Sequence, residues 1–258
     1  MIQSITESEI DVFINSPGGF AEVTESLVTM LRSKFGHVRF IVPNMAKSAA
    51  TLFCLSGNEI LMDHRGELGP IDPQIEYPTR DGRKQEAAEA IIEGFEEAKE
   101  ALVREGPSAT PAYLPLLEKY TIGLLRGCKN AMLLSKQLAG DWLKTYMFAD
   151  NADSTKPAEI SEYLASHANT LSHSRAIGID KCKEIGLNIK DLREPANQSL
   201  ADKMWELWCV YELHFERSPV HKIYENSSGC SLEKQTLQMI IGPPPVPGQQ
   251  HPQQPPQA

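Results

Sequence analysis

The sequence predicts an α/β fold built around a parallel sheet, and three segments near the start of the chain carry this prediction. The run EIDVFINS at 9–16 alternates apolar and polar side chains and leads into SPGG, which is typical of a strand that ends in a glycine turn. Residues 20–34 carry apolar side chains at helical spacing and are followed by Gly36. The β-branched run HVRFIVP at 37–43 then indicates a second strand that a proline closes.

Two further elements complete the predicted core. Small side chains at 48–56 indicate a short helix, and EILM at 59–62 indicates a third strand before the turn-rich sequence DHRGELGPIDPQI. Because strands and helices alternate, we expect crossover connections and a parallel sheet within residues 1–80.

The remainder of the chain is predicted to be mainly helical. Helices are expected at 84–105, twice within 111–147, at 156–166, at 179–187 and at 200–216, with a small strand in LNIKDL. From Pro243 onward, sixteen residues include seven prolines and five glutamines, which is too few apolar side chains to fold. We therefore divide the chain into an α/β core at 1–80, a helical extension with a small α/β segment at 81–242, and a disordered tail at 243–258.

Composition and charge exclude several classes of function. The formal net charge of −9 and the lack of a basic tract argue against nucleic acid or an anionic membrane surface as a partner. Five scattered cysteines without a CxxC pair favour neither a disulfide framework nor a zinc site, so we expect no metal and no cofactor. The first residues lack the positive charge and the apolar run of a signal peptide, and we expect a soluble, cytoplasmic protein with reduced thiols.

Ser48 is the residue around which the sequence indicates chemistry. It lies in NMAKSAATLFCLSG, at the start of the small-residue helix. A serine hydroxyl is a weak nucleophile, so catalysis requires a general base and hydrogen-bond donors for the oxyanion. The backbone N–H groups of Gly19, in SPGG, and of Ala49 are the donors that we would name. These residues alone slightly favour a structural interpretation, in which SPGG is a tight turn and Ser48 allows close helix packing.

The order of three motifs changes this balance. FINSPGG, AKSAATL and GPIDPQ together resemble the Clp protease and crotonase superfamily, and within it the serine dehydrogenase proteinase family, which is related to signal peptide peptidase A. Further segments resemble helical and C-terminal parts of that family, namely 111–120, 134–148, 172–189 and 221–229. The resemblance implies a Clp protease/crotonase-like ββα superhelix with a helical C-terminal half.

The same resemblance implies a serine endopeptidase. Ser48 matches the family's nucleophile, and Gly18, Gly19 and Ala49 match its oxyanion region. A polypeptide substrate and assembly into a homo-oligomer are implied as well, without a cofactor. Membrane association is implied only through an N-terminal segment that relatives carry. About ten residues precede the first strand here, so we expect an unpaired sheet edge or a strand supplied by another subunit.

The general base has lysine candidates. The peptidase A branch uses a lysine a few dozen residues after the serine, and Lys84 lies 84 − 48 = 36 residues downstream. A lysine acts as a base only when burial or a nearby cation makes its deprotonation easier. Lys99 is a weaker candidate on a charged helix face. Lys47 adjoins the serine, but neighbouring side chains on a helix point apart.

Histidines offer the alternative, since the Clp branch uses a histidine and an aspartate. His64 in MDHRGELG and His173 in SHSRAIG are the candidates, and Asp63 and Asp72 are carboxylates that would orient a base. A structural role for Asp72 is also open, because it lies between two prolines where it would cap a turn. Lys222 lies in family-like sequence without assigned chemistry.

Two other functions remain open at this point. A crotonase-type acyl-coenzyme A enzyme would use the same oxyanion donors without a nucleophile. A catalytically inactive homologue would act as a binding or scaffold protein and would not depend on Ser48.

Overall fold

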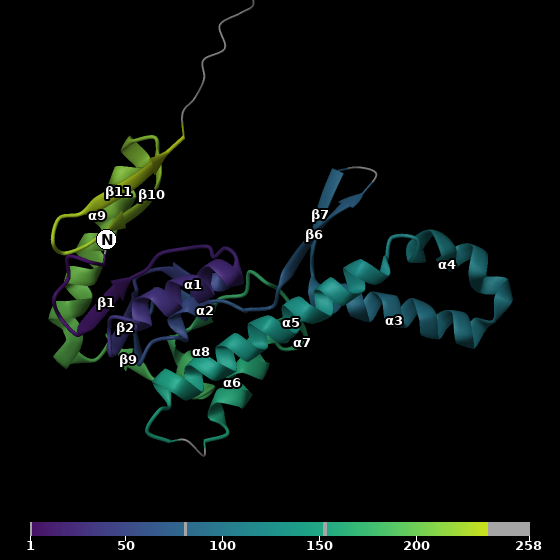
Figure 1. Cartoon of the computed structure of the whole chain (residues 1–258), viewed down its shortest axis with the longest axis horizontal. Helices are drawn as coiled ribbons and strands as arrows, with labels where there is room; N and C mark the ends of the chain where they lie inside the picture. Colours follow the sequence, from purple (N-terminus) through teal and green to yellow (C-terminus); the bar gives the residue numbers. More distant parts are fainter. Residues whose placement is uncertain (1, 80–81, 152–153, 237–258) are drawn as a thin grey trace, which may run out of the picture. The chain divides into compact units, whose positions relative to one another are not determined.

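The computed structural model describes residues 2–79, 82–151 and 154–236 of the 258-residue chain (Figure 1). The described residues fall into two compact units, which we treat separately. The larger unit is Ile5–Cys209, and the smaller one contains the residues up to Ser4 and those from Val210 onward. The predicted disordered tail at 243–258 lies outside the described residues.

The larger unit is built on a four-stranded parallel sheet with the order β1–β2–β4–β9. Its strands are β1 (Glu9–Phe13), β2 (His37–Val42), β4 (Glu59–Met62) and β9 (Ile189–Asp191). In β2 every second side chain is buried, whereas Ile60, Leu61 and Met62 of β4 are all fully buried. A continuous apolar run is expected of a parallel strand that is covered on both faces. The predicted α/β class and its parallel strands are therefore confirmed.

Two helices make the first crossovers of this sheet. They are α1 (Ala21–Arg32), between β1 and β2, and α2 (Ala49–Cys54), between β2 and β4. One face of α1 buries Val28 and Leu31, which lie three residues apart and therefore on the same side of the helix. An adjacent face exposes the apolar side chains of Val23, Leu27 and Met30, and Phe20 at the N-cap is exposed as well.

A second, smaller sheet has three strands of two residues each, in the order β3–β5–β8. They are β3 (Met45–Ala46), β5 (Glu67–Leu68) and β8 (Ile177–Gly178). Strand β5 runs parallel to β3 and antiparallel to β8. Hence the C-terminal ends of β3 and β5 and the N-terminal end of β8 lie at one edge of this sheet.

The middle of the chain begins with a hairpin and continues as helices. The elements are β6 (Gln74–Thr79), β7 (Gly82–Ala87), α3 (Ala88–Glu105), α4 (Thr110–Leu117), α5 (Ile122–Trp142), α6 (Lys156–Ala165) and α7 (His167–Thr170). The helix predicted at 84–105 is wrong at its start, because residues 84–87 form part of β7. Antiparallel pairing with β6, in register from Thr79 opposite Gly82 to Gln74 opposite Ala87, overrides the helix propensity of this stretch.

Two helices close the larger unit, α8 (Ile179–Glu184) and the first part of α9 (Gln198–Arg217). Ala201 and Met204 of α9 pack with Leu61 and Leu192 in a buried apolar cluster. In the described part of the chain, no helix combines the length and the hydropathy that crossing a membrane requires.

The smaller unit pairs the end of α9 with an antiparallel hairpin, β10 (Val220–Glu225) and β11 (Ser231–Gln235). Within it, Tyr211 donates a hydrogen bond to Glu225 over 3.1 Å, and His214 Nε2 lies 3.1 Å from Glu233 Oε1. Lys222 lies on β10 with its ammonium 5.1 Å from the centre of the Tyr224 ring.

Candidate active site

The backbone at Ser48 has an unusual conformation. Its φ of 53° and ψ of −121° lie outside the regions that residues with a Cβ normally adopt. Among the described residues, Leu171 is the one other non-glycine with positive φ. Such a conformation costs about 1–3 kcal/mol and is concentrated at functional sites. The residue lies between β3 and α2 and is partly exposed, and its hydroxyl has no hydrogen bond within the described part of the chain.

Hydrogen bonds fix the SPGG turn beside this serine. The N–H of Ser16 donates to Met45 O over 2.9 Å, and the N–H of Lys47 donates to Ser16 O over 3.0 Å. Ser16, which follows β1, therefore forms a parallel bridge with Ala46 of β3. The chain after β1 and the chain before α2 consequently lie side by side.

Gly18 is the glycine of the SPGG turn that packs against Ser48. A Cβ added to Gly18 would lie 2.7 Å from Lys47 O, 2.9 Å from Ser48 Cβ and 3.2 Å from Ala49 N. Its φ of +112° also favours glycine. Both observations require a residue without a side chain at this position, because any Cβ would displace the serine.

Of the backbone N–H groups in the SPGG turn and at the start of α2, one donates a hydrogen bond within the protein and two do not. The N–H of Gly18 donates to Ser16 Oγ over 3.1 Å. In the described part of the chain, the N–H groups of Gly19 and Ala49 donate to no protein acceptor. These two groups are thus free to bind an anionic oxygen beside Ser48.

The ammonium of Lys47, another candidate for the general base, is bound to strand β5. Its Nζ lies 2.6 Å from Glu67 Oε1 and donates to Leu68 O over 3.1 Å, and its side chain is 13% exposed. Gly69 allows this arrangement, because an added Cβ would meet Lys47 Cδ at 2.7 Å. The ammonium is therefore bound as a cation by the strand β5.

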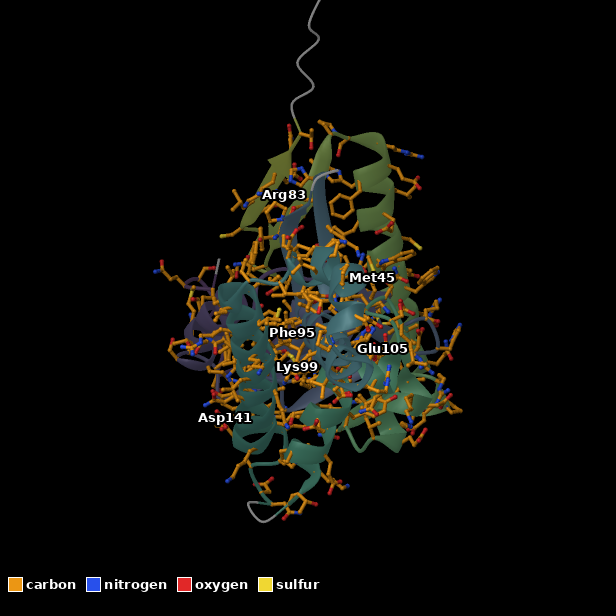
Figure 2. All side chains as sticks on the ribbon, turned by 90° about the vertical axis from the view of Figure 1, so that its right-hand side faces the viewer. Met45, Arg83, Phe95, Lys99, Glu105 and Asp141 are labelled. Carbon is orange, nitrogen blue, oxygen red and sulfur yellow. The ribbon has the colours of Figure 1, made fainter. Side chains whose placement is uncertain are left out.

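Lys84 lies on the β7 strand of the hairpin. Its ammonium forms an ion pair with Glu86, which also accepts a hydrogen bond from Tyr77, and its side chain is 58% exposed. No hydrogen bond joins Lys84 to Ser48 among the described residues. Lys99 lies on α3 (Figure 2), also largely exposed, with Nζ 2.6 Å from Glu96 Oε2.

His64 is exposed, and its neighbour Asp63 is engaged elsewhere. Asp63 accepts hydrogen bonds from the N–H of Arg65 over 2.8 Å and from its Nε over 2.9 Å. Burial alone would raise the pKa of Asp63, but these hydrogen bonds outweigh it and the pKa is lowered. Asp63 therefore orients Arg65 and does not orient His64. The guanidinium of Arg65 lies 4.0 Å from the centre of the Trp205 ring.

His173 has the arrangement of an oriented base. Its Nδ1 lies 2.7 Å from Oδ1 of Asp72, a carboxylate that is 1% exposed. Gln74 Nε2 donates to the second oxygen of Asp72 over 2.9 Å. An ionised carboxylate accepts hydrogen bonds only, so this contact selects the neutral tautomer of His173 with the proton on Nδ1 and the lone pair on Nε2.

The small sheet brings Ser48, Asp72 and His173 to one edge. Ser48 follows the end of β3 by 48 − 46 = 2 residues, and Asp72 follows the end of β5 by 72 − 68 = 4 residues. His173 precedes β8 by 177 − 173 = 4 residues. Strand β5 lies between β3 and β8, so the strand ends from which Ser48 and His173 extend are two spacings of about 4.8 Å apart, with that of Asp72 between them. Among the described residues, no hydrogen bond joins His173 to Ser48.

A second histidine at Asp72 was missed by the sequence reasoning. Nδ1 of His167, on α7, lies 3.4 Å from Asp72 Oδ2. The signal that would have pointed to it is the Ser-His dipeptide that occurs at 166–167 and again at 172–173. Nothing in the sequence indicated the contribution of Gln74.

Metal binding has no structural support within residues 2–79, 82–151 and 154–236. No group of three or more His, Cys, Asp or Glu side chains is arranged there to hold an ion.

Comparisons with known proteins agree with the motif resemblance. Residues 2–93 match the family described as ClpP-like SDH-type serine proteinase, a range that contains Ser48, Asp72 and Lys84 but not His173. This match confirms the family resemblance and the fold class that it implies.

Two curated relatives come from Methanocaldococcus jannaschii. The uncharacterized protein MJ1495 is 27% identical over 203 residues, which are 78% of this chain and 56% of that protein. The uncharacterized protein MJ0137 is 27% identical over 184 residues, covering 71% of this chain and 54% of that protein. The chain thus spans about half the length of the curated relatives that it matches.

Two solved structures are similar as well, both of the 1510-N membrane-bound stomatin-specific protease. A serine-to-alanine mutant has a TM-score of 0.43 and 13% identity, covering 78% of this chain and 72% of that chain. A lysine-to-alanine mutant in complex with a substrate peptide has a TM-score of 0.43 and 14% identity, covering 76% of this chain and 66% of that chain.

Proposed function

We propose that this chain hydrolyses peptide bonds with Ser48 as the nucleophile, because residues 2–93 match the family of ClpP-like SDH-type serine proteinases. The observation that carries this proposal is the strained backbone of Ser48 together with the close approach of the SPGG turn to it. Ser48 has positive φ, and the N–H groups of Ala49, the next residue, and of Gly19, which follows the closely approaching Gly18, bind no protein acceptor in the described part of the chain. Preorganised donors at a nucleophile are what stabilisation of an oxyanion requires.

Catalysis begins with attack of Ser48 Oγ on the carbonyl carbon of the scissile peptide bond. The carbonyl oxygen becomes an oxyanion that accepts hydrogen bonds from Gly19 and Ala49, while Gly18 lets the turn approach closely enough. The C–N bond then breaks, the amine leaves with the proton taken from Ser48, and an acyl-enzyme remains. Water hydrolyses this ester in the second half of the reaction.

We assign the proton transfer to His173 in preference to Lys84. The carboxylate of Asp72 holds the Nδ1–H tautomer of His173 and leaves Nε2 as the acceptor that a general base needs. Lys84 is 58% exposed and its ammonium is engaged in an ion pair with Glu86 on the same strand of the hairpin. Hydrogen bonds to a nucleophile are often long without substrate, so the unbonded hydroxyl of Ser48 agrees with this role.

A polypeptide substrate and assembly into a homo-oligomer belong to the same proposal. The exposed apolar face of α1, which contains Phe20, Val23, Leu27 and Met30, supports self-association, because soluble monomers rarely expose such a stripe. A cytoplasmic location stays a prediction, with which the five free cysteines agree.

The test is hydrolysis of an unfolded protein such as reduced casein, followed by mass spectrometry of the released peptides. The native chain is expected to release peptides, and Ser48→Ala is expected to abolish their release. Ser33→Ala removes another serine hydroxyl, which donates to Met30 O over 2.8 Å, and serves as the matched control that retains activity. Equal hydrolysis by the native chain and Ser48→Ala would contradict the proposal.

A further inference from the structure

We propose that Lys47 is a positioning residue for Ser48. Its ion pair with Glu67 ties the chain before the serine to strand β5 and thereby keeps the serine in its positive-φ conformation. This role rests on the proposed function where it concerns hydrolysis. The conformation of Ser48 itself is measured without any substrate, so the two are tested separately.

The conformation of Ser48 requires restraint by its surroundings. A residue with φ of 53° and ψ of −121° lies in a sparsely populated region, and such residues persist only where the neighbouring structure fixes them. Strand β3, which leads towards Ser48, has two residues, whereas most strands have about three to ten. Its ladder with β5 is correspondingly short and pairs Met45 with Glu67 and Ala46 with Leu68. Side-chain contacts beyond the end of this ladder therefore gain importance.

Lys47 makes such a contact immediately after β3. Its Nζ lies 2.6 Å from Glu67 Oε1 and donates to Leu68 O over 3.1 Å. The side chains of Lys47 and Glu67 are 13% and 33% exposed, so salt screens this pair less than a fully exposed one. The stem of the lysine packs on Gly69, where an added Cβ would lie 2.7 Å from Cδ and 3.4 Å from Cα of Lys47. Both the charge and the stem of Lys47 are thus held by residues 67–69.

Thr51 attaches the other side of the serine to the same residues. It lies on α2, is fully buried, and its Oγ1 donates to Ala46 O over 2.6 Å. The same oxygen accepts the N–H of Gly69 over 2.9 Å. The chain before Ser48 and the helix after it are therefore both tied to residues 67–69, the former by Lys47 and the latter by Thr51.

The backbone of Lys47 also contacts the two segments that carry the backbone donors. Its N–H donates to Ser16 O over 3.0 Å, and its carbonyl oxygen accepts the N–H of Ala50 over 2.9 Å. That carbonyl oxygen also lies against Gly18, where an added Cβ would be 2.7 Å from it. A shift of Lys47 would therefore displace Ser48 relative to the SPGG turn and to the start of α2. Misplacement of a reacting group lowers the rate of the chemical step.

The contacts of Lys47 distinguish this role from that of a general base. Its ammonium is bound by Glu67 and by Leu68 O, and among the described residues no hydrogen bond joins Nζ to Ser48. Replacing a lysine that took the proton from Ser48 would lower activity whether or not Glu67 were present. A positioning lysine depends on Glu67, and a double-mutant cycle measures this dependence.

The cycle consists of Lys47→Met, Glu67→Ala and the double variant, each compared with the native full chain in casein hydrolysis. Methionine keeps an unbranched apolar stem on Gly69 without the ammonium. Each single substitution is expected to lower kcat by about ten-fold and to change KM by less than about two-fold, because fewer molecules hold the competent conformation. The double variant should be no slower than Lys47→Met. Lys181→Met removes an ion pair of equal length, with Glu184 on α8, and should leave kcat unchanged.

Three results of the cycle would overturn the inference. One is a native kcat in Lys47→Met, and another is a double variant whose loss of kcat is the product of the two single losses. The third is a loss of about 10²-fold or more in Lys47→Met beside full activity in Glu67→Ala, which would make Lys47 the base. If Lys47→Met does not fold, Glu67→Ala decides alone, and a native kcat in that variant overturns the inference.

Crystal structures of the native chain and of Glu67→Ala test the conformation without hydrolysis. The native chain should show Ser48 at positive φ, and most molecules of the variant should show it at negative φ. An unchanged positive φ in the variant overturns the inference even if kcat falls. A relaxed Ser48 in the variant, together with a native chain that does not hydrolyse casein, supports the positioning role and overturns the proposed function instead.

Discussion

His173 Nδ1 and Asp72 Oδ1 lie 2.7 Å apart, although 101 positions separate the two residues in the sequence. Asp72 follows strand β5, and His173 precedes strand β8, which pairs antiparallel with β5. The hydrogen bond therefore joins the segment that follows β5 to the segment that precedes β8. Ser48 follows β3 at the same end of the small sheet. A buried carboxylate of this kind holds the imidazole in one tautomer, which is the form that a general base requires.

Asp72→Asn should greatly reduce hydrolysis while leaving the chain folded. The amide nitrogen of asparagine would favour the opposite tautomer of His173, with the proton on Nε2. We expect kcat to fall on the order of 10²–10⁴-fold, as for the loss of the orienting aspartate in serine protease triads. Far-UV circular dichroism provides the control for folding. Activity within about three-fold of the native value would exclude an orienting role for Asp72.

The base itself is identified by a pair of variants. His173→Gln should lower kcat by about 10²-fold or more. Lys84→Ala should stay within about three-fold of the native chain, because it removes an exposed ion pair worth about 0–1 kcal/mol. Peptide hydrolysis measured at saturating substrate distinguishes the two. The reverse order of effects would assign the base to Lys84.

Gly18→Ala should both unfold the site and abolish activity. The added Cβ would contact Lys47 O at 2.7 Å, and a positive φ disfavours alanine by about 1–3 kcal/mol. Gly19→Ala is the matched control, because an added Cβ there meets nothing within 4 Å. Urea unfolding measures the free energies. Equal stability of the two variants would show that the turn does not pack against Ser48 as described.

Protonation of Asp191 at acid pH should lower the stability of the larger unit. Hydrogen bonds from Arg193 and Lys183, at 2.8 and 2.7 Å, hold the pKa of this carboxyl well below its ordinary value of about 3.9. A lowered pKa means that the stabilisation is complete above about pH 4 and is lost as the pH falls further.

The measurement for Asp191 compares thermal unfolding of the native chain and Asp191→Asn between pH 7 and pH 2. At pH 7 the substitution should cost about 1–3 kcal/mol, and the two unfolding curves should converge as Asp191 becomes protonated. A difference that stayed constant down to pH 2 would argue against this carboxylate as the source.

The sequence predicted the parts of the fold that carry a long apolar pattern. The strands at 37–42 and 59–62 bury alternating or consecutive side chains, and the strand at 9–13 begins with exposed and half-buried side chains in alternation, which periodicity detects. Strands of two residues, such as β3 and β5, have no period to detect. The start of β7 was mistaken for helix because KQEA favours helices locally, whereas cross-strand pairing with β6 determines its structure.

The candidate site was predictable to the same limited extent. Ser48, Gly19 and Ala49 lie within short motifs whose spacing along the chain is informative. The partnership of Asp72 with His173 depends on the pairing of β5 with β8 and leaves no local trace. The approach of His167 depends in addition on a backbone hydrogen bond to Glu89, which no sequence pattern encodes.

The central claim, that Ser48 is an activated nucleophile, is tested most directly by labelling the purified chain with a fluorophosphonate probe. The account predicts a covalent adduct that peptide mapping places on Ser48, that Ser48→Ala abolishes, and that Ser33→Ala leaves intact. A crotonase-type acyl-coenzyme A enzyme and an inactive scaffold both predict no adduct. Absence of labelling in a chain shown to be folded would contradict the assignment of Ser48 as a nucleophile.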